Sequence, residues 1–328
     1  MNLLILGGTR FVGRHMTRAA LERNHTVTLF NRSNTNPDLF PDVEHLCGDR
    51  DGDMSALEGR SWDAVIDTCG YVPRVVRKSA ELIQAEHYTF VSSISVYPDD
   101  MPLHADESAE VIQLEDPTTE EVVGETYGGL KVLCEEVVRE VFPDAALLLR
   151  PGLIVGPFDY TDRFVYWPHR VDEGGEVLAP ESPDVPIQFI DARDFADFAI
   201  ASVEDRLTGT YNVVSPADHF TMGELLETCK KVSESDATFT WVAEDFLLER
   251  GIRRWSWDLP LWMKEEDRNF LRVSSQKALS QGLEIRPLEL TVRDTLGWDK
   301  TRPEGEFTRV VSKEREREIL QEWRERQQ

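Results

Sequence analysis

The stretch Met1-Asn-Leu-Leu-Ile-Leu-Gly-Gly-Thr-Arg-Phe-Val-Gly13 decides the fold. Asn2 to Leu6 is a short apolar run, which is typical of a buried parallel strand. Residues 7–9 (Gly-Gly-Thr) end this strand, and the apolar positions that follow have helical spacing. A helix that starts at such a turn presents free backbone N–H groups and the positive end of its dipole. The stretch therefore predicts a pyrophosphate-binding turn between a strand and a helix.

The glycine spacing in this turn is Gly7-x-x-Arg10-x-x-Gly13. Gly7 permits the tight turn, and Gly13 permits close packing of the helix on the strand. Arg10 replaces the middle glycine of the usual dinucleotide-binding pattern. The alternative is a plain tight turn in an α/β protein, but the strand–turn–helix context favours dinucleotide binding.

The rest of the sequence alternates between short apolar segments and helical patterns. Strands are predicted over residues 26–31, 43–47, 63–67, 88–92, 146–149, 187–190 and 210–214, and helices over 73–85, 120–141, 194–203 and 222–233. Alternation at this interval predicts an α/β protein with a Rossmann-type, doubly wound parallel sheet and a smaller C-terminal substrate domain.

The character of the sequence changes after Gly156-Pro157, where aromatic residues, arginine and proline occur without clear periodicity. We expect a dinucleotide-binding domain over residues 1–157 plus about 187–215, and a substrate-binding domain over 158–186 plus about 216–300. Residues 301–328 form a charged C-terminal segment, helical over 312–328, whose Ile319, Leu320 and Trp323 are expected to dock one turn.

The composition excludes several classes of protein. The 328 residues carry a net charge of −25, which argues against a nucleic-acid partner because such binding needs a basic surface. No apolar run has the ~20 residues of a membrane span. The four cysteines lack metal-ligand spacing, and no export signal precedes the first strand. We therefore expect no metal, no membrane association and a cytoplasmic location with reduced thiols.

A possible proton-transfer site comes from three polar residues. Ser93 follows the predicted strand 88–92, and Tyr127 and Lys131 are four residues apart, hence on one helix face. An ammonium beside a phenol lowers the pKa of the tyrosine from its usual ~10. With the serine hydroxyl, this set suits interconversion of a carbonyl and an alcohol. A Tyr-x-x-x-Lys motif by itself is more often an ordinary pair on the surface of a helix. Here the motif follows the glycine turn and the serine along the chain, and this order favours a catalytic role.

The sequence resembles the extended short-chain dehydrogenases/reductases of the NAD(P)-dependent epimerase/dehydratase family, over about residues 1–215. The motifs that carry the resemblance are Gly7–Gly13, Gly48-Asp49, Thr68-Cys69-Gly70 in place of Leu-Ala-Ala, Ser92-Ser-Ile-Ser-Val-Tyr97, Tyr127-Gly-Gly-Leu-Lys131, and Arg150-Pro151-Gly152 through Gly156-Pro157. The remainder is only loosely similar.

The resemblance implies an oxidoreductase or epimerase that moves a hydride between a small-molecule substrate and NAD(P). It assigns proton exchange to Tyr127, the nicotinamide ribose to Lys131 and polarisation of the substrate oxygen to Ser93. A homodimer through two helices per subunit is also expected. The implied cofactor-binding residues are Gly7, Thr9, Arg10, Phe11, Val12, Gly13, Asn31, Arg32, Asp49, Cys69, Gly70, Tyr127, Lys131, Pro151 and Gly152.

Two departures from the family pattern bear on function. Arg10 replaces a glycine, and Asn31 stands where an acidic residue commonly holds the ribose. The turn also resembles that of an atypical branch with reductase-like and chloroplast RNA-binding members. The alternative function is thus a non-catalytic nucleotide-sensing or RNA-binding protein on the same fold. The intact Ser–Tyr–Lys set favours an enzyme.

The sequence predicts NADP over NAD. A carboxylate at the end of the second strand accepts from the ribose 2′-hydroxyl and repels a 2′-phosphate. Asn31-Arg32 removes that repulsion and adds a guanidinium, and Arg10 adds a second one. The alternative is that both arginines are solvated and the cofactor is NAD.

Candidates for substrate binding are a threonine, an arginine and three aromatic residues, which suit a sugar or a phosphorylated ligand. They are Thr119, Arg163, Tyr166, Trp167 and Trp257. For any single one, core packing or surface pairing is the alternative. Gly128 and Gly129 within a helix indicate either close approach of another group or the start of the helix. The sequence does not separate reduction, epimerisation and dehydration.

Overall fold

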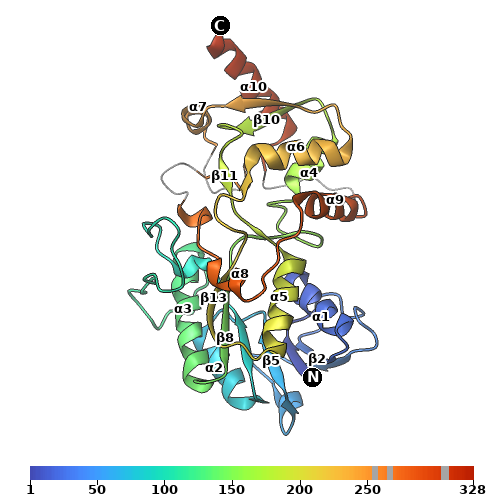
Figure 1. Ribbon diagram of the computed structural model, residues 1–328, viewed down its shortest axis with the longest axis vertical. Helices are drawn as coiled ribbons and strands as arrows, with labels where there is room; N and C mark the ends of the chain where they lie inside the picture. The colour runs from blue at the N-terminus through green and yellow to red at the C-terminus, as the bar shows by residue number, and fades with distance from the viewer. Residues whose placement is uncertain (253–257, 264–268, 304–309) are drawn as a thin grey trace. The chain divides into compact units, whose positions relative to one another are not determined.

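The structure is a computed structural model that describes residues 1–252, 258–263, 269–303 and 310–328 (Figure 1). The chain divides into two compact units. Unit 1 comprises Met1–Ile154, Ala192–Val214 and Val273–Glu284, and unit 2 comprises Val155–Asp191, Ser215–Arg272 and Ile285–Gln328. The predicted assignment of cofactor and substrate to separate domains stays a prediction.

Unit 1 is built on a seven-stranded parallel sheet with the order β13-β8-β7-β5-β1-β2-β3. The strands are β1 (Asn2–Leu6), β2 (Thr26–Asn31), β3 (Glu44–Cys47), β5 (Ala64–Asp67), β7 (Tyr88–Val91), β8 (Ala146–Pro151) and β13 (Gly209–Val213). Most of their side chains are buried, as expected for strands covered on both faces. The predicted α/β, doubly wound fold is confirmed.

The strand order reverses direction beside β1, which pairs with β2 on one side and with β5 on the other. Leu6 is aligned with Phe30 of β2 and with Asp67 of β5. The turns that follow β1 and β5 therefore begin at the same edge of the sheet. In open α/β sheets, ligands bind at the carboxyl ends of the strands where the order reverses.

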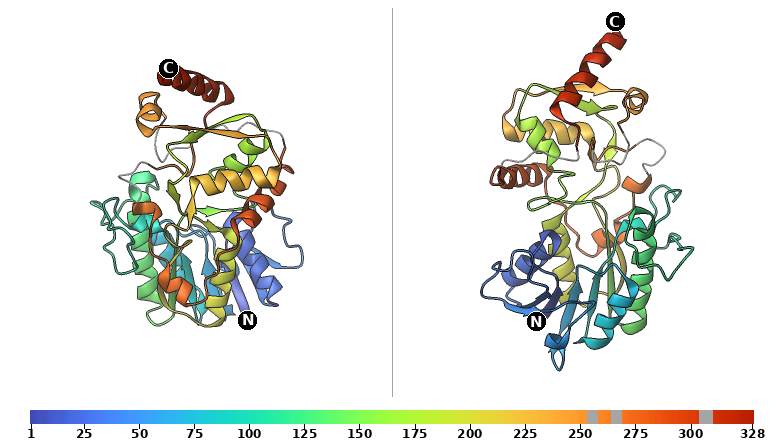
Figure 2. Two further views of the ribbon diagram at one scale, coloured as in Figure 1. Left: turned by 45° about the horizontal axis from the view of Figure 1, so that its top comes forward. Right: turned by 180° about the vertical axis from the view of Figure 1, so that it is seen from behind.

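Two pairs of helices cover the sheet (Figures 1 and 2). α1 (Phe11–Glu22) packs against α5 (Ala192–Glu204), and α2 (Pro73–Leu82) packs against α3 (Gly124–Val141). A buried cluster that includes Leu4, Val76, Phe90 and Leu148 joins the sheet to the second pair. The short elements of unit 1 are η1 (Ser55–Leu57), β4 (Ser61–Trp62), β6 (Gln84–Ala85), η2 (Ile94–Val96) and α8 (Gln276–Ser280); β9 (Ile154–Val155) lies at the passage to unit 2.

Unit 2 contains short strands and five described helices. They are α4 (Tyr166–Asp172), β10 (Glu176–Pro180), β11 (Pro186–Ile187), β12 (Ile190–Asp191), β14 (Phe220–Thr221), α6 (Met222–Ser233), β15 (Thr238–Val242), α7 (Glu244–Glu249), α9 (Leu288–Asp299) and α10 (Lys313–Gln327). Thr221 caps α6, because its side-chain oxygen accepts from the backbone N–H of Glu224. The predicted docking of α10 is confirmed, because Ile319 and Leu320 are buried and Trp323 contacts Phe246.

Several predicted boundaries are wrong by a few residues. The helix predicted over 120–141 begins at Gly124, because Val123 is still extended. The helix predicted over 73–85 ends at Leu82, since Gln84–Ala85 pairs with Ser61–Trp62 instead. The strand predicted over 187–190 is split into β11 and β12, because residues 188 and 189 both hydrogen-bond to Ser215. The region 158–186, which lacks clear periodicity, contains α4 and β10.

Among the helices that the structure describes, none combines the length and the apolar character that crossing a membrane requires.

Candidate active site

The glycine turn after β1 has a backbone that only glycine accommodates easily. Gly7 and Gly8 have φ values of +106° and +92°. A Cβ at Gly7 would lie 2.5 Å from the side-chain oxygen of Thr68, and a Cβ at Gly13 would lie 2.7 Å from the backbone nitrogen of Gly8. The first turn of α1 is thus packed directly against the glycine turn, as the sequence predicts for a dinucleotide site.

Residues after β2 brace this turn from the side. The Asn31 side chain donates to the Gly7 carbonyl oxygen at 2.8 Å and accepts from the backbone N–H of Ser33. Thr9, which is buried, donates its hydroxyl to the carbonyl oxygen of Thr35. Asn36 donates to the carbonyl oxygen of Thr9 at 2.9 Å. The side chains of Thr9 and Asn31 therefore shape the turn.

The N-terminus of α1 fits an anionic group. Its N-cap residue is Arg10, which makes no side-chain capping bond, and its first turn, which includes Phe11 and Val12, contains no acidic residue. The positive end of the helix dipole is consequently not neutralised locally. Arg10 and Arg32 are both exposed on this side of unit 1. A glycine cradle beside such a helix end fits a pyrophosphate.

Lys131 is a buried cation at the carboxyl ends of two central strands. Its side-chain nitrogen donates to the carbonyl oxygens of Gly70 and Val91, both at 2.7 Å. It also lies 4.4 Å from the centre of the Phe90 ring. Only 3% of the residue is exposed. Burial lowers the pKa of Lys131 to about 8.

Tyr127 lies one turn before Lys131 on α3 and is half-buried. Both Tyr127 and Lys131 contact the ring of Tyr71. The Tyr127 and Tyr71 ring centres are 6.4 Å apart, and the Lys131 nitrogen is 5.2 Å from the centre of the Tyr71 ring. Tyr127 and Lys131 therefore share one helix face near the segment that follows β5.

Ser93 belongs to a segment that packs against the start of α3. Its hydroxyl accepts from the backbone N–H of Ser95 at 3.0 Å and caps η2. A Cβ at Gly128 would overlap the carbonyl oxygen of Ser95, and one at Gly129 would overlap Leu114. Of the two readings of these glycines, the structure supports close approach, because α3 has already begun at Gly124.

The other predicted cofactor residues lie in unit 1 after the ends of its strands. Asp49 follows β3, and its carboxylate accepts from the backbone N–H of Asp51. Cys69 and Gly70 follow β5, and burial raises the pKa of the Cys69 thiol. Pro151 ends β8, and Gly152 comes next, with Ile94 and Val214 beside it.

The predicted substrate residues are divided between the two units. Thr119 is in unit 1, whereas Arg163, Tyr166 and Trp167 are in unit 2. Trp167 is fully buried and donates its indole N–H to the carbonyl oxygen of Pro260, and Tyr166 is 3% exposed. Both aromatic residues are buried, as the alternative of core packing expects, and their role in substrate binding stays a prediction. Trp257 lies outside the described residues.

Two buried ion networks in unit 1 were not predicted from the sequence. Arg50 pairs with Asp67 at the end of β5. Arg150 binds Glu135 through two hydrogen bonds of 2.8 and 2.7 Å and also donates to the hydroxyl of Tyr97. Glu135 is four residues after Lys131, so a carboxylate at the next i+4 position was a signal in the sequence.

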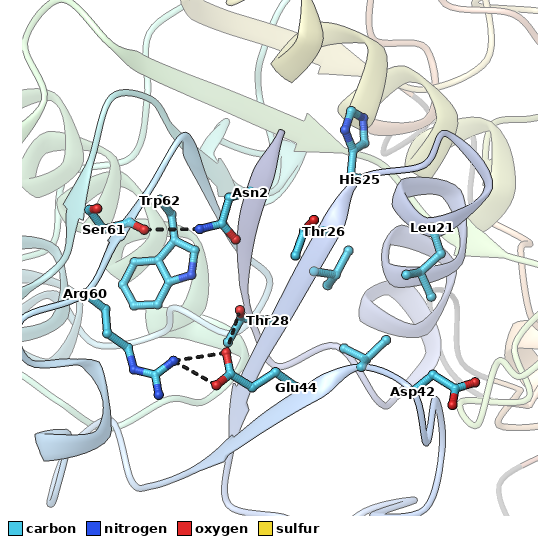
Figure 3. Close-up of a pocket in the computed structure, with 12 residues that line it drawn as sticks. Asn2, Leu21, His25, Thr26, Thr28, Asp42, Glu44, Arg60, Ser61 and Trp62 are labelled. Carbon is cyan, nitrogen blue, oxygen red and sulfur yellow. Dashed lines mark hydrogen bonds and ion pairs between the residues drawn. The ribbon is translucent and has the colours of Figure 1, made fainter.

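A hollow of about 540 Å³ lies at the opposite edge of the sheet (Figure 3). Asn2 and Thr26, which line it, begin β1 and β2, whereas the glycine turn follows the end of β1. Arg60 and Glu44 form an ion pair of 2.9 Å at its margin (Figure 3). This hollow is therefore separate from the candidate active site.

Several solved structures similar to this chain are UDP-sugar 4-epimerases. The UDP-glucose 4-epimerase of Thermotoga maritima is 16% identical, with 92% of this chain and 99% of that chain covered and a TM-score of 0.65. The UDP-Glc/GlcNAc 4-epimerase of Campylobacter jejuni gives the same identity and coverage and a TM-score of 0.67. The NAD complex of a UDP-glucuronic acid 4-epimerase from Bacillus cereus is 15% identical, with 92% and 99% covered and a TM-score of 0.67.

The chain has the fold of the extended short-chain dehydrogenase/reductase epimerases. The resemblance found in the sequence is thus confirmed at the level of the fold. No family model matches the sequence. A curated relative, the chloroplast stem-loop binding protein of 41 kDa b from Arabidopsis thaliana, is 28% identical over 198 residues, or 55% of this chain and 49% of the relative. The chain spans about half the length of this relative.

Proposed function

We propose that the chain is an NAD(P)-dependent enzyme of the epimerase/dehydratase or reductase type, acting on a carbonyl or alcohol of a small, sugar-like substrate. The observation that carries the proposal is the burial of Lys131 one helical turn from Tyr127, at the carboxyl ends of β5 and β7. A buried cation with a strongly lowered pKa is more often found at functional sites than elsewhere.

The residues of unit 1 fit a dinucleotide. Gly7, Gly8 and Gly13 allow a close turn in which a Cβ would overlap neighbouring protein atoms, and the start of α1, which has no side-chain cap, suits the pyrophosphate. When bound, the nicotinamide accepts or returns a hydride. The chain's own task is to hold the substrate carbon against it and to exchange the hydroxyl proton.

Three side chains divide this task. Tyr127 exchanges a proton with the substrate oxygen, and Ser93 donates a hydrogen bond to the same oxygen. The ammonium of Lys131 favours the phenolate of Tyr127 and binds the nicotinamide ribose. Support comes from the i, i+4 spacing of Tyr127 and Lys131 and from the packing of the Ser93–Ser95 segment on α3. This arrangement serves reduction, epimerisation and dehydration alike, since all begin with hydride transfer.

Two lines of support bear on the choice of cofactor. Three of the similar solved structures are NAD complexes, which favours NAD. The absence of a carboxylate at Asn31 and the exposure of Arg32 favour NADP, as predicted from the sequence. Because the side chain of Asn31 already bonds Gly7 and Ser33, we assign Arg32 to the 2′-phosphate of an NADP cofactor.

A nucleotide sugar is the substrate class that the comparisons support, since the similar enzymes act on UDP-sugars. The arginine and threonine predicted from the sequence, Arg163 and Thr119, remain our proposed substrate-binding residues, since an arginine suits phosphates and a threonine suits a hydroxyl. The homodimer expected from the resemblance belongs to the same proposal.

RNA binding, suggested by the name of the curated relative, is not favoured. A net charge of −25 opposes contact with a phosphate backbone.

The experiment is a panel of UDP-sugars incubated with the chain and either NAD or NADP, monitored at the absorbance of reduced nicotinamide and by NMR of the sugar. Wild type is expected to interconvert or reduce at least one sugar. Tyr127→Phe is expected to bind the dinucleotide normally and to lose at least about 100-fold in rate, the usual contribution of a general acid–base. Full activity in Tyr127→Phe would refute the assignment.

A further inference from the structure

A buried ion pair in unit 1 links three separate segments of the chain. Asp67 is the last residue of β5 and is fully buried, and Arg50 reaches it from the segment after β3. One guanidinium nitrogen of Arg50 lies 2.7 Å from one carboxylate oxygen, and a second nitrogen bonds the other oxygen. The same guanidinium donates twice to the hydroxyl of Ser79 on α2, at 3.0 and 2.8 Å.

The carboxylate of Asp67 has two further donors. The hydroxyl of Tyr88 donates to it at 3.0 Å, and the backbone N–H of Cys69 donates at 3.1 Å. Burial favours the neutral acid, but the guanidinium of Arg50 outweighs burial and lowers the pKa of Asp67. Asp67 is thus held as a carboxylate with all its oxygen positions used.

A buried ion pair such as Arg50–Asp67 adds little net free energy to the folded state. Removing two charges from water costs several kcal/mol for each ion, and apolar residues of similar volume often stabilise a core equally well. A completely bonded ion pair in such a place specifies geometry more than it adds free energy. The question is which geometry it specifies.

The backbone held by Asp67 is the backbone that receives Lys131. Cys69 N–H is bonded to Asp67, and the next residue, Gly70, accepts the ammonium of Lys131 at 2.7 Å. Gly70 has no freedom to move toward the sheet, because a Cβ there would lie 2.5 Å from the ring of Phe90. The path from Arg50 to Lys131 therefore runs through three hydrogen bonds, Arg50–Asp67, Asp67–Cys69 and Gly70–Lys131, and the backbone of Cys69 and Gly70.

Charge provides a second connection between the pair and the lysine. The ionisable groups near the ammonium include Asp67 from β5, Arg50 from the segment after β3, Cys69 and Tyr71 from the segment after β5, and Cys134 and Glu135 from α3 itself. Asp67 and Glu135 favour the ammonium, whereas Arg50 and burial oppose it. Within the ion pair, the effect of Asp67, which raises the pKa of Lys131, offsets the effect of Arg50, which lowers it.

We propose that Arg50 and Asp67 are positioning residues of the candidate active site, which fix the Cys69–Gly70 segment and through it the ammonium of Lys131. The role of Lys131 rests on the proposed function, but its link to the ion pair does not. The substitution Asp67→Asn keeps the shape and removes the charge, leaving Arg50 unbalanced near Lys131. Arg50→Lys keeps the charge but cannot bond both carboxylate oxygens at once.

The test combines two measurements. The titration of Lys131 is followed by NMR on protein labelled at lysine Cε, with the resonance identified by its loss in Lys131→Met. Dinucleotide affinity is measured by calorimetry. Asp67→Asn is expected to move the Lys131 midpoint downward by about 1 pH unit and to weaken dinucleotide binding about 10-fold. The double variant Arg50→Gln/Asp67→Asn is expected to restore the midpoint but not the affinity.

Arg50→Lys is expected to leave the midpoint near that of wild type and to weaken binding several-fold, so the proposal is testable even if Asp67→Asn fails to fold. The matched control is Arg170→Met, which breaks the buried pair of Arg170 with Glu316 in unit 2 and is expected to leave the Lys131 midpoint unchanged. Folded Asp67→Asn or Arg50→Lys protein with wild-type midpoint and affinity would overturn the proposal. Failure of wild type to bind any dinucleotide would instead refute the proposed function, while the NMR titration still tests the link.

Discussion

The side-chain nitrogen of Lys131 lies 2.7 Å from the carbonyl oxygen of Gly70, so the lysine of α3 is joined directly to the segment that follows β5. That segment starts beside the glycine turn after β1, because Leu6 and Asp67 are aligned in the sheet. The two halves of the candidate site, dinucleotide turn and proton-transfer helix, therefore meet at one edge of unit 1.

Gly7→Ala is expected to weaken dinucleotide binding by about 10- to 100-fold, the equivalent of one lost hydrogen bond to a charged group. The new Cβ would meet the Thr68 hydroxyl at 2.5 Å and displace the turn. Gly59→Ala is the matched control, since Gly59 also has a positive φ, +71°, but nothing within 4 Å. Both variants are titrated with NADH and NADPH by calorimetry. Equal losses in the two would show that backbone strain alone is responsible.

Gly128→Ala is expected to lower the free energy of unfolding by about 1–3 kcal/mol, because the methyl group overlaps the Ser95 carbonyl and overpacks the contact. Gly124→Ala, in the first turn of the same helix with no neighbour within 4 Å, is expected to change stability little. Urea denaturation of both variants measures the difference. Equal stability of the two would contradict the close approach of α3 and η2.

Lys131 is expected to make the free energy of unfolding depend on pH between about pH 7 and 9. Its pKa falls from the ordinary 10.5 to about 8 in the folded state, so between these values the unfolded chain binds more protons than the native one. Stability of wild type relative to Lys131→Met is therefore expected to rise with pH, by about 1 kcal/mol between about pH 7 and 9. Denaturant unfolding of both proteins across this range gives the difference. A difference independent of pH would contradict the buried ammonium.

Arg32→Ala tests the choice of cofactor. If Arg32 binds a 2′-phosphate, the change is expected to weaken NADPH binding about 10-fold and to leave NADH binding unaltered. Arg18→Ala, an exposed arginine on α1, is the control for net charge. Tighter NADH binding in wild type, with no selective effect of Arg32→Ala, would instead agree with the NAD-bound structures.

Much of unit 1 is predictable from the sequence because its signals are local. Local spacing of apolar residues is enough to predict the run Asn2–Leu6, the glycine turn and the apolar strands that follow. The i, i+4 relation of Tyr127 and Lys131 follows from the helix alone. The end of α2 at Leu82 is less predictable, because the residues after it pair with the distant segment Ser61–Trp62.

The environment of the site residues is not local and was not predictable. Arg50 and Asp67 are separated by 17 residues and meet only because β3 and β5 lie in the same sheet. Trp167 looked like a substrate residue by type, yet its ring is buried in unit 2, since aromatic composition does not distinguish core from pocket. The sequence also does not show that the side chain of Asn31 bonds the Gly7 carbonyl oxygen, and its place in the cofactor site stays a prediction.

The most direct test of the central claim is a crystal structure of the chain with NAD or NADP. The account predicts the pyrophosphate at the N-terminus of α1, with the ribose next to the nicotinamide within hydrogen-bonding distance of both the Tyr127 hydroxyl and the Lys131 nitrogen. A dinucleotide bound elsewhere, or one whose nicotinamide half lies away from Tyr127 and Lys131, would contradict it.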